Sequence, residues 1–228
     1  MHIQQLIPQR TDRAVLVGMT GSGKTTLAEY LCSYRDYVVV YDWKKEINWR
    51  GYRQVSSIKE LQDVDVTEPA NNRLIYQPSE DEIDNDEAID AFFYFCYMRS
   101  HPNCDLGVYV DEVSAVTKSR VQLPQYYLNL IARGRTRGVS VYSGTQRPRR
   151  VPLNIFSESE YGFYFLLSVE TDREVIENNV GIPAEKIEGL EKREFYSTSV
   201  YRPRGQRVLG PFKLDLNRSH SDGRSNAA

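Results

Sequence analysis

Short apolar runs alternate with longer amphipathic segments along most of this chain. The apolar runs are rich in β-branched and aromatic residues, and they end at glycine, proline or acidic residues, which is typical of buried strands. The strands predicted in this way are 13–18, 37–42, 72–78, 106–113, 139–145 and 161–167, with two more near 193–200 and 207–214.

Segments with helical spacing separate these strands. Leu27, Tyr30, Leu31 and Tyr34 recur as on one face of a helix, which predicts a helix from Thr25 to Tyr34. Because strands separated by helix-length segments are typical of parallel sheets, the pattern predicts an α/β fold with a mainly parallel central sheet flanked by helices. Further helices are expected at 56–64, at 79–98 with Ser79 as the N-cap, at 123–135 with an end at Gly134 or Gly138, and at 171–179.

The pattern predicts one domain without an internal linker. Residues 1–12 read as an N-terminal extension and 13–216 as the domain, while the small polar residues of 217–228 predict a disordered tail. Neither a signal peptide nor an apolar run of about 18 residues is present, so we expect an intracellular protein without a transmembrane segment.

Composition excludes several classes of function. Acids and bases nearly balance, with a net charge of −2, so any preference for nucleic acid must be local. The three cysteines and three histidines are scattered without a C-x-x-C pair, which argues against a disulfide framework and a zinc site and fits a reducing cytosol.

A phosphate-binding motif, G-x-x-x-x-G-K-[ST], lies between the first predicted strand and the first predicted helix as GMTGSGKT. Its glycines let the backbone turn N–H groups toward phosphates, Lys24 reaches the β- and γ-phosphate oxygens, and the Thr25 hydroxyl ligates Mg²⁺. The nucleotide contacts predicted here are Gly18, Met19, Thr20, Gly21, Ser22, Gly23, Lys24, Thr25 and Thr26.

Two acids follow another apolar run, LGVYVDEV at 106–113. Asp111 would hold Mg²⁺ directly or through water, while Glu112 would orient and deprotonate an attacking water. The alternative is a solvated acidic pair at a strand end; the phosphate motif upstream favours the catalytic interpretation. A glutamate beside the Mg²⁺ aspartate suits a hydrolase because water is a poor nucleophile. The guanine-specifying N-K-x-D motif is absent, which favours ATP.

Arginine is concentrated in RGRTRGVSVYSGTQRPRR, residues 133–150, which holds six arginines and no acid. The acid-free region extends from Val113 to Ser157 and also includes Lys118 and Arg120. A run of one sign predicts an anionic partner, either the DNA backbone or the nucleotide of a neighbouring subunit. For each single arginine, a solvated surface residue or a carboxylate partner is the alternative.

Three motifs in this order resemble the FtsK–HerA superfamily of DNA-pumping ATPases over roughly residues 13–180. They are the phosphate loop, the Asp111–Glu112 strand end and GRTRGVSVYSGTQRP. In that superfamily a helix ends in Arg-x-x-Gly, and the strand that follows closes with Thr-Gln-Arg-Pro, here Arg135–Gly138 and Thr145–Pro148. The phosphate motif is shared by many families, whereas the second combination is more specific. The resemblance implies a P-loop NTPase fold of the RecA-like (ASCE) type.

The resemblance also implies roles for single residues. Gln146, at the tip of a strand between the two nucleotide-binding strands, would detect the γ-phosphate or its attacking water. Arg135 would be an arginine finger that reaches the ATP of the neighbouring subunit, with Arg133 and Arg137 as alternatives. In YDWKKE, Asp42 and Lys44 match an aspartate and a lysine of the family. Three further arginines would contact DNA or the subunit interface: Arg147, Arg149 and Arg150.

Only a short segment precedes the first predicted strand, and no winged helix is evident after residue 190, so the resemblance points to the bare motors of the superfamily. Most of these are genome-packaging ATPases of membrane-containing icosahedral viruses. The implied function is a homo-oligomeric ring, a hexamer, that uses ATP and Mg²⁺ to move double-stranded DNA into a procapsid. Capsid-vertex or other packaging proteins would be partners, and the host cytoplasm or the packaging vertex of the virion the location.

Other functions stay open. A conjugative, plasmid or cellular DNA-pumping ATPase would share the same chemistry. A kinase of nucleotides or other small molecules, or a scaffold that binds ATP without hydrolysing it, belongs to another class. ATP turnover that rises with DNA separates the motors from the kinase.

Overall fold

A computed structural model of the protein describes residues 6–65, 67–117 and 122–215. The strands are β1 (Arg13–Val17), β2 (Tyr37–Tyr41), β3 (Arg53–Val55), β4 (Arg73–Tyr76), β5 (Leu106–Val110), β6 (Val139–Thr145), β7 (Tyr161–Phe165), β8 (Glu194–Ser199) and β9 (Val208–Lys213). The α-helices are α1 (Lys24–Cys32), α2 (Ile58–Gln62), α3 (Asp86–Arg99), α4 (Val113–Val116), α5 (Gln125–Arg133), α6 (Leu153–Ser157), α7 (Glu170–Val180) and α8 (Ala184–Glu188). Short 3₁₀ turns are η2 (Pro69–Asn71), η3 (Gly134–Arg137) and η4 (Pro148–Arg150).

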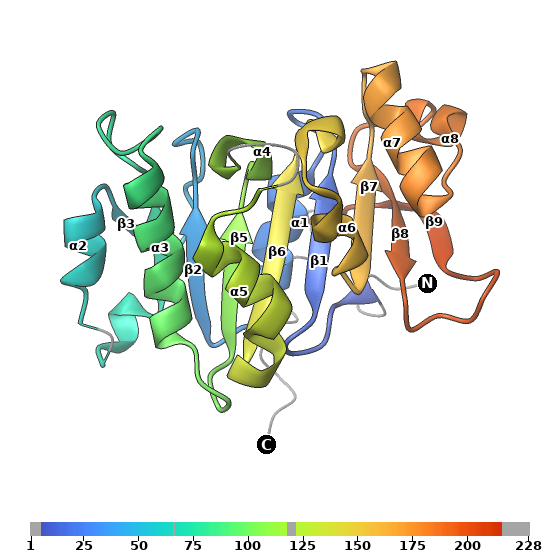
Figure 1. The fold of residues 1–228 in the computed structure, drawn as a ribbon. Coiled ribbons are helices and arrows are strands. Elements are labelled where there is room, and N and C mark those ends of the chain that lie inside the picture. Colours follow the sequence, from blue (N-terminus) through green and yellow to red (C-terminus); the bar gives the residue numbers. More distant parts are fainter. Residues whose placement is uncertain (1–5, 66, 118–121, 216–228) are drawn as a thin grey trace.

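The described strands form one sheet in the order β3-β4-β2-β5-β6-β1-β7-β8-β9 (Figure 1). All pairs from β3 to β7 are parallel, whereas β8 and β9 are antiparallel to their neighbours. The predicted α/β fold with a mainly parallel sheet is confirmed.

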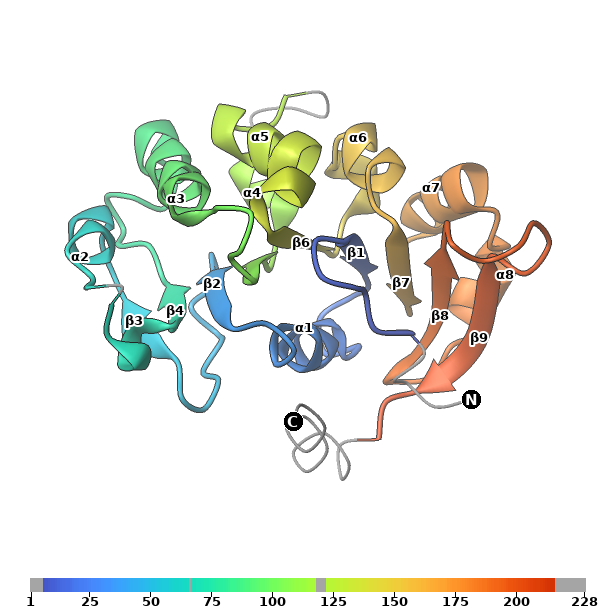
Figure 2. The same ribbon diagram turned by 90° about the horizontal axis from the view of Figure 1, so that it is seen from below.

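Alternate residues of each strand point to opposite faces, so the sheet carries a core on each side. Helices α3, α5, α6 and α7 cover one face and α1 covers the other (Figure 2). Val15 and Val17 of β1 belong to the core under α3 and α5. Ala14 and Leu16 pack with Leu27 of α1 in the opposite core. β1 is therefore buried on both faces, as its continuous apolar run predicted.

Each apolar run contains the predicted strand, but β5 ends at Val110 and α4 begins at Val113, so the prediction of a strand through 113 was too long. Two further kinds of detail differ. Helix α3 begins at Asp86, not near Ser79, because the Asn85 side chain caps it by accepting the N–H groups of Glu87 and Ala88 at 2.9 and 3.4 Å. Ser79 as N-cap was wrong. β3 and the short helices α4, α6 and α8 were not predicted, since segments of three to five residues show too little periodicity. Helix α2 is equally short, but a serine cap, Ser57, marks its start.

The described parts cover most of the predicted domain. Of the predicted extension 1–12, residues 6–12 are described, and Leu6 and Asp12 are buried. Residue 216, the predicted tail 217–228, and Lys118 and Arg120 lie outside the described residues. Within those residues, no helix has the length and apolarity that crossing a bilayer requires.

Parallel topology gives the sheet two functionally different edges. The parallel strands point upward in Figure 1, so the loops that follow β1, β5 and β6 meet at the upper, carboxyl edge. Turn η3 precedes β6 and lies at the lower, amino edge. Ligand sites of open α/β sheets lie at the carboxyl edge.

Candidate active site

The phosphate loop, Gly18–Thr25, connects β1 to α1 and is held by its neighbours. The Gly18 N–H donates to the Thr145 carbonyl at 3.1 Å, and the Met19 N–H donates to the Leu166 carbonyl at 2.9 Å. Gly23 has a φ of 115°, and a Cβ there would lie 3.1 Å from Cδ1 of Leu214. Only glycine combines that conformation with so close a neighbour. The loop is thus fixed between the ends of β6 and β7.

Lys24 is a buried cation at the start of α1. Only 4% of the Lys24 surface is exposed. Burial lowers the pKa of its ammonium group, and the carboxylates of Asp111 and Glu112 oppose that shift. Lys44 is also close enough to lower the pKa of Lys24 by charge repulsion. Two cations therefore lie near this loop, which suits a polyphosphate ligand.

The two predicted Mg²⁺ ligands lie together although they are far apart in sequence. The Thr25 hydroxyl donates to Oδ1 of Asp111 at 3.3 Å, and the Tyr109 hydroxyl donates to the same oxygen at 2.7 Å. A hydroxyl and a carboxylate are the oxygen ligands that Mg²⁺ prefers, completed by water and phosphate oxygens. These residues therefore fit the predicted ion. Among the described residues, no group of three or more His, Cys, Asp or Glu forms a metal site of its own.

Glu112 is held by the end of β6. Its Oε1 accepts the hydroxyls of Thr145 and Ser114 at 2.8 and 2.7 Å, and its Oε2 accepts the Gln146 N–H at 2.9 Å. Asp111 and Glu112 are each only 6% exposed. Burial excludes the alternative of a solvated acidic pair at a strand end. An oriented, buried carboxylate beside a phosphate site is suited to act as a general base.

Gln146 lies against the phosphate loop. Strand β6 runs between β5 and β1, which confirms the predicted position of this residue between the two nucleotide-binding strands. Its Oε1 accepts the Thr20 hydroxyl at 2.8 Å. A small cavity of about 190 Å³ borders the pair and is lined by Met19, Thr20, Gln146, Arg147, Leu167, Ser168, Val169 and Asp172.

Asp42, predicted from the family resemblance, is fully buried at the end of β2. Its Oδ2 accepts the Ile47 N–H at 2.7 Å and the Gln77 side-chain amide at 2.9 Å. These bonds fold the segment after β2 back toward the sheet. Lys44 lies on that segment, so Asp42 holds the second cation near the phosphate loop.

Arg137, one of the alternative finger residues, is engaged within the chain. Its Nη2 donates to the Tyr97 and Ser100 carbonyls at 3.0 and 2.6 Å, and its guanidinium carbon lies 4.2 Å from the centre of the Tyr97 ring. The next residue, Gly138, has a φ of 70°, and a Cβ there would lie 2.0 Å from the Cys104 carbonyl oxygen. Arg-x-x-Gly therefore docks the end of η3 against the segment after α3.

Arg133, the last residue of α5, and Arg135, in η3, are exposed close to the amino end of β6. Their side chains form no hydrogen bond or ion pair with any other described residue. The seven residues of β6 separate this end from the phosphate loop, a span of about 20 Å at ~3.3 Å per residue. An arginine side chain cannot bridge that distance. Neither residue can reach the nucleotide of its own chain.

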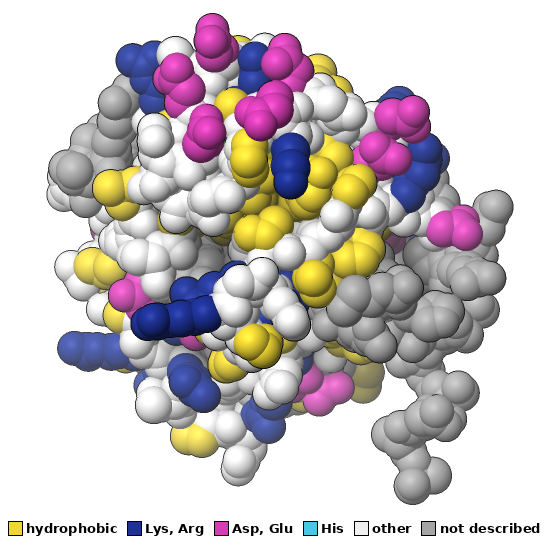
Figure 3. Space-filling view, turned by 90° about the vertical axis from the view of Figure 1, so that its right-hand side faces the viewer, with side chains coloured by type: hydrophobic (Ala, Val, Ile, Leu, Met, Phe, Trp, Pro, Cys, Tyr) yellow, Lys and Arg dark blue, Asp and Glu magenta, His cyan; other side chains and the backbone are white. Residues whose placement is uncertain are grey.

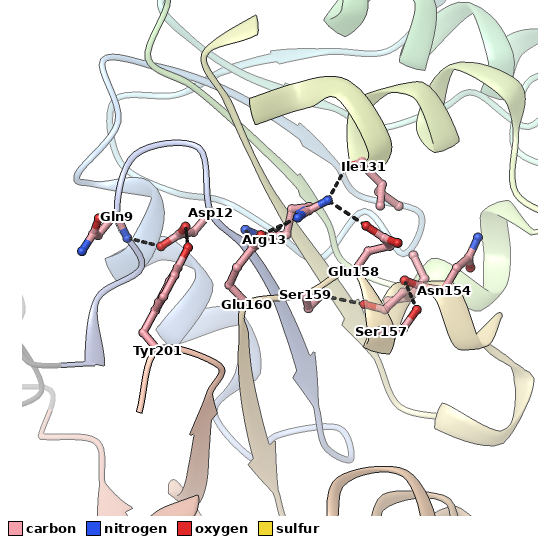
Figure 4. Close-up of polar contacts among 11 residues, drawn as sticks. Gln9, Asp12, Arg13, Ile131, Asn154, Ser157, Glu158, Ser159, Glu160 and Tyr201 are labelled. Carbon is pink, nitrogen blue, oxygen red and sulfur yellow. Dashed lines mark hydrogen bonds and ion pairs between the residues drawn. The ribbon is translucent and has the colours of Figure 1, made fainter. Parts of the chain in front are cut away.

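A network around Arg13 anchors the part of α5 that leads to these arginines (Figure 4). Its Nη1 donates to the Ile131 carbonyl at 2.6 Å and to Glu158 at 3.1 Å, and its Nη2 pairs with Glu160. The hydrogen bonds from Arg13 to Glu160 raise the pKa of the guanidinium. The end of α5 is thus tied to the starts of β1 and β7.

Arg147, Arg149 and Arg150 lie at the carboxyl edge, after β6. Nη1 of Arg147 lies 3.3 Å from Oδ2 of Asp172, which is buried. The side chains of Arg149 and Arg150 are exposed and have no polar partner in the described parts of the chain. Of the three, only Arg147 is already paired.

Several residues of the site were not predicted. Tyr109 shares a face with Asp111 because they are two positions apart on one strand, and that spacing could have indicated their contact. Thr145 and Ser114 also bind Glu112, and Asp172 binds Arg147. Thr145 belongs to the Thr-Gln-Arg-Pro motif, although its contact with Glu112 was not predicted. Nothing local distinguishes Ser114 and Asp172 from other polar residues at the ends of elements.

Comparison with curated proteins places this site in context. The chain is 27% identical over 187 residues to the DNA packaging ATPase P9 of Enterobacteria phage PRD1, covering 79% of this chain and 75% of the relative. It is 22% identical over 190 residues to Protein P9 of Pseudoalteromonas phage PM2, with 80% and 84% covered. No protein-family profile matches the chain.

Solved structures share the fold. The genome packaging NTPase B204 of Sulfolobus turreted icosahedral virus 2, in complex with AMPPCP, superposes with a TM-score of 0.70 at 16% identity and covers 89% of this chain and 98% of its own. The bacterial conjugative coupling protein TrwBdeltaN70 gives a TM-score of 0.61 at 10% identity, with 84% and 83% covered. The predicted P-loop NTPase fold and the predicted resemblance to packaging ATPases are confirmed.

Proposed function

We propose that this protein is an ATPase that drives double-stranded DNA into a viral procapsid. ATP hydrolysis is supported by one observation above all: Lys24, Asp111 and Glu112 lie together at the carboxyl edge of the sheet. DNA packaging is supported by the PRD1 relative, which is named a DNA packaging ATPase. ATP as the nucleotide is supported by the B204 complexes with ATP analogues.

The chemistry follows from the contacts around the phosphate loop. Loop N–H groups and the Lys24 ammonium bind the β- and γ-phosphates, which add negative charge beside a buried cation. Thr25 and Asp111 would hold Mg²⁺, which supplies charge neutralisation on the phosphate oxygens. Glu112 takes a proton from the attacking water at one carboxylate oxygen, and Gln146 orients that water beside the γ-phosphate.

A head-to-tail ring, proposed as a hexamer, explains the distribution of charged residues. Acidic side chains gather in the upper part of the face beyond β9 (Figure 3). The exposed arginines Arg133 and Arg135 lie at the opposite edge, as does the β8–β9 loop with Arg204 and Arg207. In a heterologous contact the basic edge of one subunit meets a different surface of its neighbour, here the acidic face formed by α7 and α8. The exposed acids of α7 and α8 are Glu170, Glu174, Glu177, Glu185 and Glu188.

Arg135 is proposed as the finger in this ring, with Arg133 as the exposed alternative. Because neither reaches the phosphate loop of its own chain, a catalytic role requires a neighbour. A guanidinium there neutralises the charge that develops on the transferring phosphoryl group. Arg149 and Arg150, and Arg147 beside them, are proposed to contact the DNA backbone or the subunit interface.

Mixing two inactive variants tests the finger. Arg135→Ala lacks the finger but keeps its phosphate loop, whereas Lys24→Ala lacks the loop lysine but keeps its finger. In a mixed ring, roughly a quarter of the subunit borders contain both intact groups, so ATPase activity returns on mixing. The matched control mixes Lys24→Ala with Glu112→Gln, two changes on the same side of the border, and stays far less active. Absence of recovery in the first mixture contradicts a finger at Arg135.

Stimulation by DNA tests the proposed function itself. We expect double-stranded DNA to raise ATP turnover of the wild-type protein several-fold, because a translocase couples hydrolysis to DNA. A small-molecule kinase would instead consume ATP only when a phosphate acceptor is present. An ATP turnover that DNA does not change contradicts the proposed motor function. Electron micrographs with ATP and DNA provide a second readout, namely a ring around DNA. The proposed place of action is the host cytoplasm, at the packaging vertex, together with capsid proteins.

A further inference from the structure

The first turn of α7 contacts the end of β6 through a buried acid. Asp172 is 3% exposed. Its Oδ2 lies 3.3 Å from Nη1 of Arg147, and its Oδ1 accepts the backbone N–H of Arg149 at 3.2 Å. One carboxylate therefore bridges two residues of the segment that follows β6.

That segment begins directly at the candidate active site. Gln146 precedes Arg147, and its backbone N–H binds Glu112 while its side chain binds Thr20 of the phosphate loop. The Arg147 N–H donates to the Thr145 hydroxyl at 3.0 Å, and the same hydroxyl donates to Glu112. Any displacement of Gln146 is thus transmitted to the backbone of Arg147.

The same turn of α7 also holds the segment after β7. Nη1 of Arg173 donates to the carbonyls of Leu167 and Ser168 at 3.0 and 3.1 Å. The residue before them, Leu166, accepts the N–H of Met19 in the phosphate loop. Asp172 and Arg173 together connect α7 to both sides of the nucleotide site.

An acid in the first turn of a helix is stabilised by the helix dipole, and that effect alone accounts for many such residues. It does not account for the two contacts to Arg147 and Arg149. A buried carboxylate is costly without a partner. Asp172 must therefore follow Arg147, or lose the ion pair, when the tip of β6 moves.

We propose that Asp172 is a positioning residue that couples Gln146 to α7 and to the exposed turn of Arg149 and Arg150. The proposal rests on the proposed function in one respect, since that turn is the proposed DNA contact. When the γ-phosphate arrives or leaves, the displacement of Gln146 passes through the Arg147–Asp172 pair to α7. The exposed arginines move with it because Asp172 holds the Arg149 N–H.

Hydrogen exchange with and without AMPPCP tests the coupling independently of DNA. In the wild-type protein we expect the analogue to change exchange in the phosphate loop, at residues 146–150 and in the first turn of α7. In Asp172→Asn the change in the phosphate loop remains, whereas the change in α7 is lost. Glu87→Gln, which neutralises an exposed acid in the first turn of α3, leaves the α7 response like that of wild type. An unaltered α7 response in Asp172→Asn, or no response in the wild-type protein, overturns the proposal.

Kinetics separate positioning from a general structural defect. We expect Asp172→Asn to lower DNA-stimulated kcat about tenfold, with the KM for ATP within about twofold of wild type. At saturating DNA, where a lost phosphate contact of Arg147 no longer limits DNA binding, adding Arg147→Ala to Asp172→Asn causes little further loss of kcat, because both changes break one pair. A rise in KM that matches the fall in kcat, or additive losses, contradicts the proposal. If DNA does not stimulate the wild-type protein, the proposed function fails, while the exchange experiment still decides the role of Asp172.

Discussion

Replacement of Glu112 by glutamine is expected to lower ATP turnover about 10³-fold, while the affinity for ATP stays within about twofold. Glutamine keeps the shape of the side chain and its acceptor oxygen, so contacts to Thr145 or Gln146 persist. It has no basicity, however, and cannot take the proton of the attacking water. The loss therefore falls on the chemical step and not on binding.

Phosphate release measures turnover, and titration with a fluorescent ATP analogue measures affinity. Glu87→Gln makes the same chemical change at an exposed position on α3 and serves as the control, with turnover like that of wild type. A Glu112→Gln protein that retains more than about a tenth of wild-type turnover contradicts the role of general base. Loss of affinity together with turnover points instead to a structural role for Glu112.

Lys24→Ala is expected to weaken ATP binding at least about 100-fold, because charge-assisted hydrogen bonds to phosphate oxygens are lost inside a buried site. Desolvation already lowers the pKa of this ammonium group, so bound phosphates raise that pKa again and keep the group protonated. The variant should therefore differ from wild type mainly when nucleotide is present.

Thermal melting provides the measurement. ATP raises the Tm of the wild-type protein through linkage between binding and folding, and this increase disappears in Lys24→Ala. Lys59→Ala removes an exposed lysine from α2 and keeps the full increase. An ATP-dependent Tm increase in Lys24→Ala equal to that of wild type contradicts the contact between Lys24 and phosphate. The two variants thus separate binding, which fails in Lys24→Ala, from hydrolysis, which fails in Glu112→Gln.

Local patterns were sufficient for every described strand except β3, and for the backbone of the site. The run before Gly18 predicted β1 because a strand buried on both faces needs consecutive apolar residues. The motif from Gly18 to Thr25 predicted the phosphate loop, since glycine spacing and a following helix are properties of contiguous residues. Asp111 and Glu112 were found in the same way, at the end of a short apolar run.

Local patterns failed where capping or short length decides an element. Ser79 and Asn85 are both suitable N-caps, and the chain uses Asn85 because residues 80–84 form turns. β3 has three residues, of which only Val55 is buried, so no periodic signal existed. Tertiary pairing with β4 makes this segment a strand.

The sequence by itself determined the sheet-forming segments other than β3, the phosphate loop and the acidic strand end, because each depends on residues that are adjacent or a few positions apart. Only the tertiary structure decided which side chains act together. In the folded chain, Glu112 is buried and accepts a hydrogen bond from Thr145, and Arg137 stacks on Tyr97. Arg135 stays exposed before β6, and Arg147 pairs with Asp172. These partners are 25 to 40 residues apart in the hydrogen-bonded pairs, so their meeting depends on the strand order, which local periodicity does not encode.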